Sequence, residues 1–117
     1  MSVKRIVANI ATESPGDAES FYGDLLGLVK VMDQGWISTF ATAPGSPQQV
    51  SFASEGGSGT PVPDLSIEVE DLGGLHRRMV EAGVRIEYGP VTEPWGVRRF
   101  FVRDPFGRLL NILSHVE

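Results

Sequence analysis

Few side chains in this sequence have both the type and the spacing that catalysis requires. Asp64 and Glu68 lie four residues apart in a segment that alternates polar and apolar residues, so both carboxylates face one side of a predicted strand. They are the pair that we nominate for general acid–base chemistry. Ser38, Ser51 and Ser66 have no evident His or Asp partner, so a nucleophilic triad has no support. The sequence contains no cysteine, which excludes disulfides, thiolate metal sites and cysteine nucleophiles.

Two histidines, His76 and His115, are the sources of imidazole for metal binding or proton transfer. His76 follows the apolar Leu75 on the flank of a predicted helix, and His115 lies just beyond the last predicted strand. We interpret both as solvated surface histidines.

Aromatic and guanidinium side chains indicate a second kind of chemistry, the binding of a ligand. Arg98 shares a strand face with Phe100, and a partly buried arginine needs a carboxylate partner, from the protein or from a ligand. Trp36 and Trp95 stand at the starts of corresponding strands, where core packing and ligand stacking explain a tryptophan about equally well. We interpret three further arginines as solvated edge charges: Arg99, Arg103 and Arg108.

The charge balance and the apolar runs exclude two classes of partner. The 117 residues carry 10 Lys and Arg against 15 Asp and Glu, a net charge of −5, which disfavours attraction to phosphate backbones. The first apolar stretch breaks at Asn9, too soon for a secretory signal, and no apolar run approaches the roughly 20 residues needed to span a bilayer. We therefore expect a cytoplasmic protein that contacts neither nucleic acid nor membrane.

The elements that must position these side chains fall into two segments with the same order. In the first segment, the β-rich stretch Val3 to Ala11 precedes a helix that begins at Pro15, after an N-cap at Ser14, and ends at Gly27. Three strands are expected to follow, at Leu28 to Asp33, Trp36 to Thr42 and Gln48 to Ala53.

The second segment repeats this plan. Strand Asp64 to Val69 precedes a helix that Asp71 caps and Gly83 closes. Three strands are again expected, at Val84 to Tyr88, Val97 to Arg103 and Arg108 to Ser114.

The repeated order predicts the fold class. Setting Phe40 on Phe100 brings Ser51 onto Asn111, which favours an internal duplication of a βαβββ unit. We predict an α+β fold of two tandem βαβββ modules that form cupped mixed sheets with the helices outside. In residue numbers, module one spans about 1–54, a Gly- and Ser-rich connector about 55–62 and module two about 63–117, all within a single domain 1–117.

Strand polarity predicts where a ligand binds. Asp64, Ser66 and Glu68 face away from the apolar side of their strand, while aromatic residues occur in other strands of the same sheets. A concave surface that mixes aromatic and polar groups is a ligand cleft by default. A solvated sheet face with a few supporting aromatics is the alternative.

Three motifs carry a resemblance to a known family. They are FYGDLLGL at Phe21 to Leu28, PWGVRRF at Pro94 to Phe100 and RDPFGRLLN at Arg103 to Asn111. They resemble the vicinal oxygen chelate superfamily, which includes glyoxalase I, extradiol dioxygenases, fosfomycin resistance enzymes and bleomycin-binding proteins. The resemblance covers essentially the whole chain and implies the glyoxalase/bleomycin resistance fold, but it does not select one activity.

The resemblance also implies four positions for metal ligands, one in the first and one in the last strand of each module. Enzymes of the family carry His, Glu or Gln there. In this chain the positions fall on Val7, Ser51 (or Gln49 if the register slips), Asp64 and Asn111, and Asp64 alone is a good ligand. A divalent metal held by Asp64, Asn111 and Gln49 would indicate a lyase, isomerase or dioxygenase, and we keep this as the alternative.

The function that we predict is the metal-independent binding of an aromatic or cationic small molecule. The chain is similar to the bleomycin-binding proteins in being acidic and in lacking the metal ligands, which implies drug sequestration, antibiotic resistance and a homodimer that completes the clefts. No catalytic residue is assigned, and a cleft filled by its own side chains is a third possibility. The predicted lining residues are Trp36, Phe40, Ser51, Asp64, Trp95, Arg98, Phe100 and Asn111.

Overall fold

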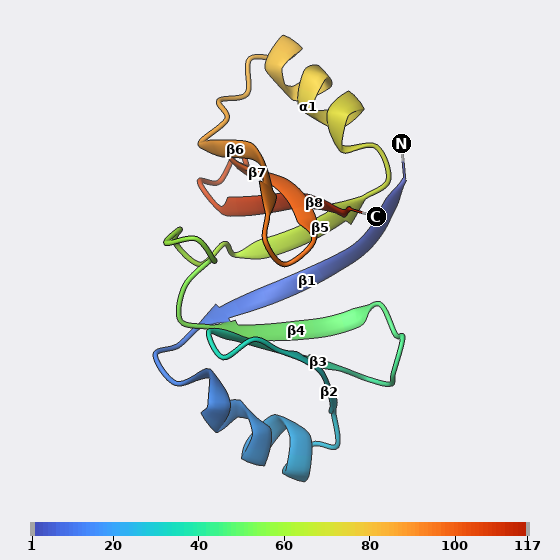
Figure 1. Cartoon of the computed structure of the whole chain (residues 1–117), viewed down its shortest axis with the longest axis vertical. Helices are drawn as coiled ribbons and strands as arrows, with labels where there is room; N and C mark the ends of the chain where they lie inside the picture. The colour runs from blue at the N-terminus through green and yellow to red at the C-terminus, as the bar shows by residue number, and fades with distance from the viewer. Residues whose placement is uncertain (1, 117) are drawn as a thin grey trace. The chain divides into compact units, whose positions relative to one another are not determined.

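Figure 1 shows the computed structural model of the chain, which describes residues 2–116. The chain divides into two units, a first unit of residues 7–62 and a second unit that combines residues 2–6 with residues 63–116. Strand β1 (Val3–Ala11) is therefore shared, because its first residues belong to the second unit and the rest to the first. We describe each unit by itself.

The first unit is a sheet in the order β2, β3, β4, β1. Strand β3 (Ile37–Ala41) pairs antiparallel with both β2 (Val29–Asp33) and β4 (Gln48–Ala53). At the end of this unit, the residues predicted as a connector form a hydrogen-bonded loop, in which Gly56 donates to the carbonyl of Thr60 at 2.7 Å.

The single regular helix predicted for this unit is wrong in its form. A 3₁₀ turn, η1 (Pro15–Asp17), is followed by a π-helix, η2 (Glu19–Leu25), in which the N–H of Leu26 donates to the carbonyl of Phe21 five residues earlier at 3.0 Å. The side chain of Ser14 makes no capping hydrogen bond. Proline and glycine have low helix propensity, and two of the first helical residues are of these types.

The core of the first unit lies between its sheet and η2. Phe40 and Phe52 pack edge to face with their ring centres 5.9 Å apart. The cluster is formed by buried Ala18, Phe40 and Phe52 with partly buried Tyr22, Leu28 and Val50.

The second unit is a mixed sheet in the order β1, β5, β8, β7, β6. Strand β5 (Leu65–Val69) runs parallel to β8 (Leu109–His115). Strand β7 (Val97–Arg103) is antiparallel to both β8 and β6 (Tyr88–Glu93).

Helix α1 (Leu72–Glu81) covers one face of this sheet (Figure 1). The predicted cap is present, because the carboxylate of Asp71 accepts the N–H of Gly74 at 3.0 Å. The core beneath the helix consists of Val69, Leu72, Phe100, Val102 and Ile112. The strand predicted at Val84 to Tyr88 is misplaced, since β6 spans Tyr88–Glu93. Val84 and Ile86 instead pack against this core from the segment between α1 and β6.

The predicted fold class is confirmed. Each unit has the predicted sequence of strand, helical segment and three strands, in an α+β fold. Within residues 2–116, no helix is both long enough and apolar enough to cross a membrane.

Candidate functional site

The strand register of the second unit assigns each side chain to one of two faces. Phe100 and Val102 pack under α1, so the alternating residues Arg99 and Phe101 lie on the opposite face. Asn111 is the cross-strand partner of Phe101 and lies on that opposite face too. We call this surface, the side of the sheet away from α1, the far face.

A buried arginine lies at the centre of the far face. The Nε of Arg99 donates to Oε2 of Glu93 at 2.7 Å, and the hydroxyl of Tyr88 donates to the same oxygen at 2.9 Å. The guanidinium carbon of Arg99 lies 5.0 Å from the ring centre of Trp95, 4.8 Å from that of Phe101 and 5.4 Å from that of Tyr88. Arg99 is 2% exposed and Glu93 is 5% exposed. We call Tyr88, Glu93, Trp95 and Phe101 together the arginine cage.

Beside this cage, Asn111 has a hydrogen-bond acceptor without a partner. Its Nδ2 donates to the hydroxyl of Ser66 at 3.1 Å. Its Oδ1 is buried and accepts no hydrogen bond from the residues that the structure describes. Buried polar groups are normally paired, so this oxygen is suited to a ligand that donates a hydrogen bond.

Glu68 is also on the far face, where two basic groups hold it. Its Oε1 lies 3.1 Å from Nε of Arg5, and its Oε2 lies 2.7 Å from Nδ1 of His115. Burial by itself would raise the pKa of Glu68, but the hydrogen bond of His115 and the charges of Arg5, His115 and Lys4 together lower that pKa. Glu68 is therefore held as a carboxylate, and His115, which is exposed at the surface as predicted, is its hydrogen-bond partner.

Asp64, the other nominated carboxylate, precedes β5 and anchors the start of β8. Its Oδ2 accepts the N–H of Leu109 at 3.0 Å, and its Oδ1 lies 3.9 Å from Nη1 of Arg108. Asp64 and Glu68 are thus each engaged with different partners, and nothing in these contacts couples them as an acid–base pair.

The predicted site residues of the first unit have structural contacts of their own. Trp36 is half-buried just before β3, and its carbonyl accepts the N–H of Ser54 at 2.9 Å. Phe40 is part of the core beside η2. The buried hydroxyl of Ser51 lies 2.7 Å from that of Thr39, within hydrogen-bond distance.

In the second unit, the structure separates the predicted residues by face. Phe100 is fully buried under α1, where the ring of His76 packs edge-on against it at 5.3 Å. Arg98 is exposed, and its Nη1 donates to the hydroxyl of Thr92 at 3.0 Å. Trp95 is part of the arginine cage, and Asn111 lies on the far face opposite Phe101 of the same cage.

Sequence reasoning missed the pair that dominates the far face, Arg99 with Glu93. The run from Arg98 to Val102 has aromatic residues at two consecutive positions, so alternation alone does not show which of them faces the helix. One feature of the sequence could have predicted this pair. An acidic residue and two aromatic residues lie close together in the segment before β7, namely Glu93, Tyr88 and Trp95.

The four positions that the family resemblance implies for a divalent metal do not fit one in this chain. Val7 has no donor atom, the hydroxyl of Ser51 lies within hydrogen-bond distance of Thr39, and Asp64 accepts the N–H of Leu109. The unpartnered Oδ1 of Asn111 is a single neutral donor, which is too little to hold a divalent cation. Across residues 2–116, no three His, Cys, Asp or Glu side chains converge as a metal-binding group.

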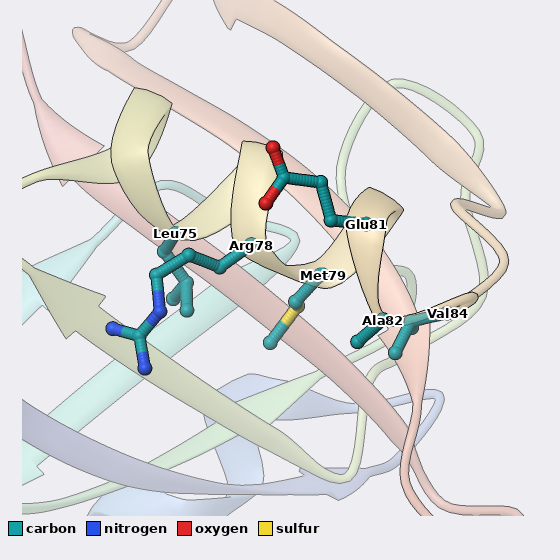
Figure 2. A pocket seen from close by; sticks show the side chains of 6 residues that line it. All are labelled: Leu75, Arg78, Met79, Glu81, Ala82 and Val84. Carbon is teal, nitrogen blue, oxygen red and sulfur yellow. The ribbon is translucent and has the colours of Figure 1, made fainter.

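A hollow of about 520 Å³ lies on the other side of this sheet, at the C-terminal half of α1 (Figure 2). Apolar side chains form its floor, and the charged ends of Arg78 and Glu81 point away from each other at its rim. The lining residues are Leu75, Arg78, Met79, Glu81, Ala82 and Val84. Because the polar groups of this hollow do not converge, the far face is the better candidate site.

Residues 4–112 match the sequence profile of the Glyoxalase/Bleomycin resistance protein/Dioxygenase superfamily. No curated protein sequence matches the chain significantly.

Solved structures show the same fold at low sequence identity. A methylmalonyl-CoA epimerase from Mycobacterium tuberculosis has a TM-score of 0.68 at 21% identity, over 98% of this chain and 88% of that chain. A glyoxalase/bleomycin resistance protein/dioxygenase superfamily member from Vibrio splendidus 12B01 has a TM-score of 0.64 at 18% identity, over 97% of this chain and 99% of that chain. The Mn(II)-bound glyoxalase from Novosphingobium aromaticivorans has a TM-score of 0.63 at 18% identity, over 97% of this chain and 38% of that chain.

Proposed function

The chain belongs to the Glyoxalase/Bleomycin resistance protein/Dioxygenase superfamily, and on that premise we propose that it binds a small molecule on the far face without using a metal. The observation that carries this proposal is the buried Oδ1 of Asn111, which accepts no hydrogen bond within residues 2–116. A ligand that donates a hydrogen bond there satisfies an acceptor whose burial is otherwise unfavourable.

The surroundings of Asn111 favour a cationic or aromatic ligand. Trp95 and Tyr88 are half-buried, so each offers ring surface for stacking. The net charge of −5 attracts a cation over a longer range. Sequestration of a cationic drug, and hence antibiotic resistance, is the form of binding that we propose.

Isothermal titration of the protein with metal-free bleomycin tests this function. We expect a dissociation constant in the micromolar range or below, and a loss of at least about tenfold in Asn111→Leu, since one charge-assisted hydrogen bond contributes about 1.5–3 kcal/mol. Gln48→Leu removes an exposed amide in the first unit and serves as the matched control. No binding of bleomycin, or equal affinity in Asn111→Leu, would contradict the proposal.

Metal independence has a separate test. Thermal unfolding of chelator-stripped protein is compared with and without Mn, Fe, Co, Ni or Zn ions. A site filled to 100 times its dissociation constant would add about 2.7 kcal/mol, and we expect no such shift because the donor set does not fit. A shift that Asp64→Ala abolishes would instead support the metal-dependent lyase, isomerase or dioxygenase.

We also propose that two copies of the chain assemble and that the protein acts in the cytoplasm. The support for assembly is an apolar surface on η2 and just after it, where Phe21 is 54%, Leu25 77% and Leu26 60% exposed. Light scattering coupled to size exclusion should give the mass of a dimer. Leu25→Glu is expected to give a monomer with unchanged circular dichroism, whereas a monomeric parent protein would refute the assembly.

A further inference from the structure

The arginine cage has the composition of a cation receptor. A carboxylate, that of Glu93, binds the guanidinium of Arg99, and the rings of Tyr88, Trp95 and Phe101 lie around it at 4.8–5.4 Å. Aromatic faces attract cations most strongly where water is excluded, and a carboxylate is the natural partner of a planar guanidinium.

We propose that the arginine cage is the recognition site for a ligand's guanidinium or amidinium group, and that Arg99 is a resident occupant which this group displaces. The inference rests on the proposed function and names the ligand class for the same face. Arg99 is thus a built-in competitor, so the free protein keeps Glu93 paired until a ligand replaces the arginine.

The walls of the cage can be reached by a ligand. Arg99 and Glu93 are buried, whereas Trp95 and Tyr88 are half-buried. Displacement requires rotation about the side-chain bonds of Arg99, which is 2% exposed in the free protein.

A displacing ligand needs a second contact, because Arg99 is tethered and has a high effective concentration at the cage. Asn111 supplies that contact. It is the cross-strand partner of Phe101, and side chains paired in this way lie about 5 Å apart at Cβ. The Oδ1 of Asn111, with no partner in the described part of the chain, is then available to a donor group on the same ligand. The ligand class is therefore a planar cation with a nearby hydrogen-bond donor.

The first test empties the cage with Arg99→Ala and supplies the missing group in solution. Guanidinium at millimolar concentration, far below its denaturing range, should raise the Tm of Arg99→Ala by several degrees relative to the same concentration of sodium chloride. Arg98→Ala, which removes the neighbouring exposed arginine, should show no such rise. Equal responses of the two variants would overturn the inference.

The second test keeps Arg99 in place, so it does not depend on the folding of Arg99→Ala. In a Trp36→Phe background Trp95 is the single tryptophan, and its fluorescence is followed during titration with benzamidine. We expect a saturable change that is lost in Glu93→Gln. No saturable change in Trp36→Phe, or an undiminished one when Glu93→Gln is added to it, would overturn the displacement.

The outcomes separate this inference from the proposed function. Bleomycin binding that depends on Asn111, without a response to guanidinium or benzamidine, overturns the cage inference alone. A response to both cations without bleomycin binding overturns drug sequestration and supports the cage as a cation site.

Discussion

Arg99 and Glu93 form an ion pair in which both side chains are shielded from water, at 2% and 4% exposed. Removing one charge from such a pair strands the other, which costs about 3–5 kcal/mol, whereas removing both costs much less. We therefore predict that Arg99→Met lowers the free energy of unfolding by about that amount, and that adding Glu93→Gln restores most of it. Urea denaturation of the two single variants and the double variant measures the coupling, and additive losses would show that there is none.

Glu68 makes a second prediction at the scale of one residue. Its pKa in the folded protein lies below the ordinary value of 4.5, so the carboxylate adds stability that is fully present above that value. This contribution is lost as pH falls through the lowered pKa of the folded state. Glu68→Gln should therefore be less stable than the parent at neutral pH, and should lose less stability on acidification.

Denaturation by urea at a series of pH values below about 5 checks this slope. Glu70→Gln, an exposed glutamate just after β5, is the matched control and should keep the slope of the parent. If the free energy of unfolding falls with pH equally in the parent and in Glu68→Gln, His115 and Arg5 do not lower the pKa of Glu68.

At the scale of the element, the two helical segments end in the same way although they differ in form. Gly27 follows η2 with φ of +85°, and Gly83 follows α1 with φ of +83°. A Cβ at either position meets no atom within 4 Å, so backbone strain is the main cost of a side chain there. Gly27→Ala and Gly83→Ala should each cost about 1 kcal/mol, as an L residue does in the left-handed region.

Gly16→Ala supplies the contrast for these two variants. Its Cβ also meets nothing within 4 Å, but its φ is not positive, so the change should be neutral or slightly stabilising. Thermal denaturation of the three variants compares them directly. A cost at Gly16 equal to that at Gly27 would remove backbone strain as the explanation.

What the sequence could predict at this scale is the order of elements and where they end. Apolar spacing and turn residues predicted the strands other than β6, the cap at Asp71 and the glycines that close both helical segments, because these signals are local. The π-helix was missed, since its spacing of apolar residues overlaps that of an α-helix. The faces of β7 were also missed. A shift of one residue exchanges Phe100 for Phe101, and both are equally apolar.

At the scale of the whole molecule, β1 is the element that belongs to both units. Its N-terminal end adjoins Ser2, whose carbonyl accepts the N–H of Glu70 at 3.1 Å in the second unit. Its C-terminal end adjoins Thr12, whose N–H donates to the carbonyl of Ala53 at 2.8 Å in the first unit. If either unit unfolds, the part of β1 that belongs to that unit loses its hydrogen-bonding partners, although β1 is one continuous strand.

A single domain over residues 1–117, as predicted from the sequence, should then unfold in one transition. Differential scanning calorimetry at fixed protein concentration should give one peak, with a calorimetric enthalpy of about 80 kcal/mol per chain. Val7→Pro, in the middle of β1, removes a backbone donor where the strand passes from one unit to the other, so it should split or broaden that peak. Ser58→Pro, in the loop between Gly57 and Gly59, places proline where φ is +54°; this is an equally drastic change outside the strand and should leave the peak single. Two peaks in the parent protein would show that β1 does not couple the units, and would make each βαβββ unit a separate folding domain.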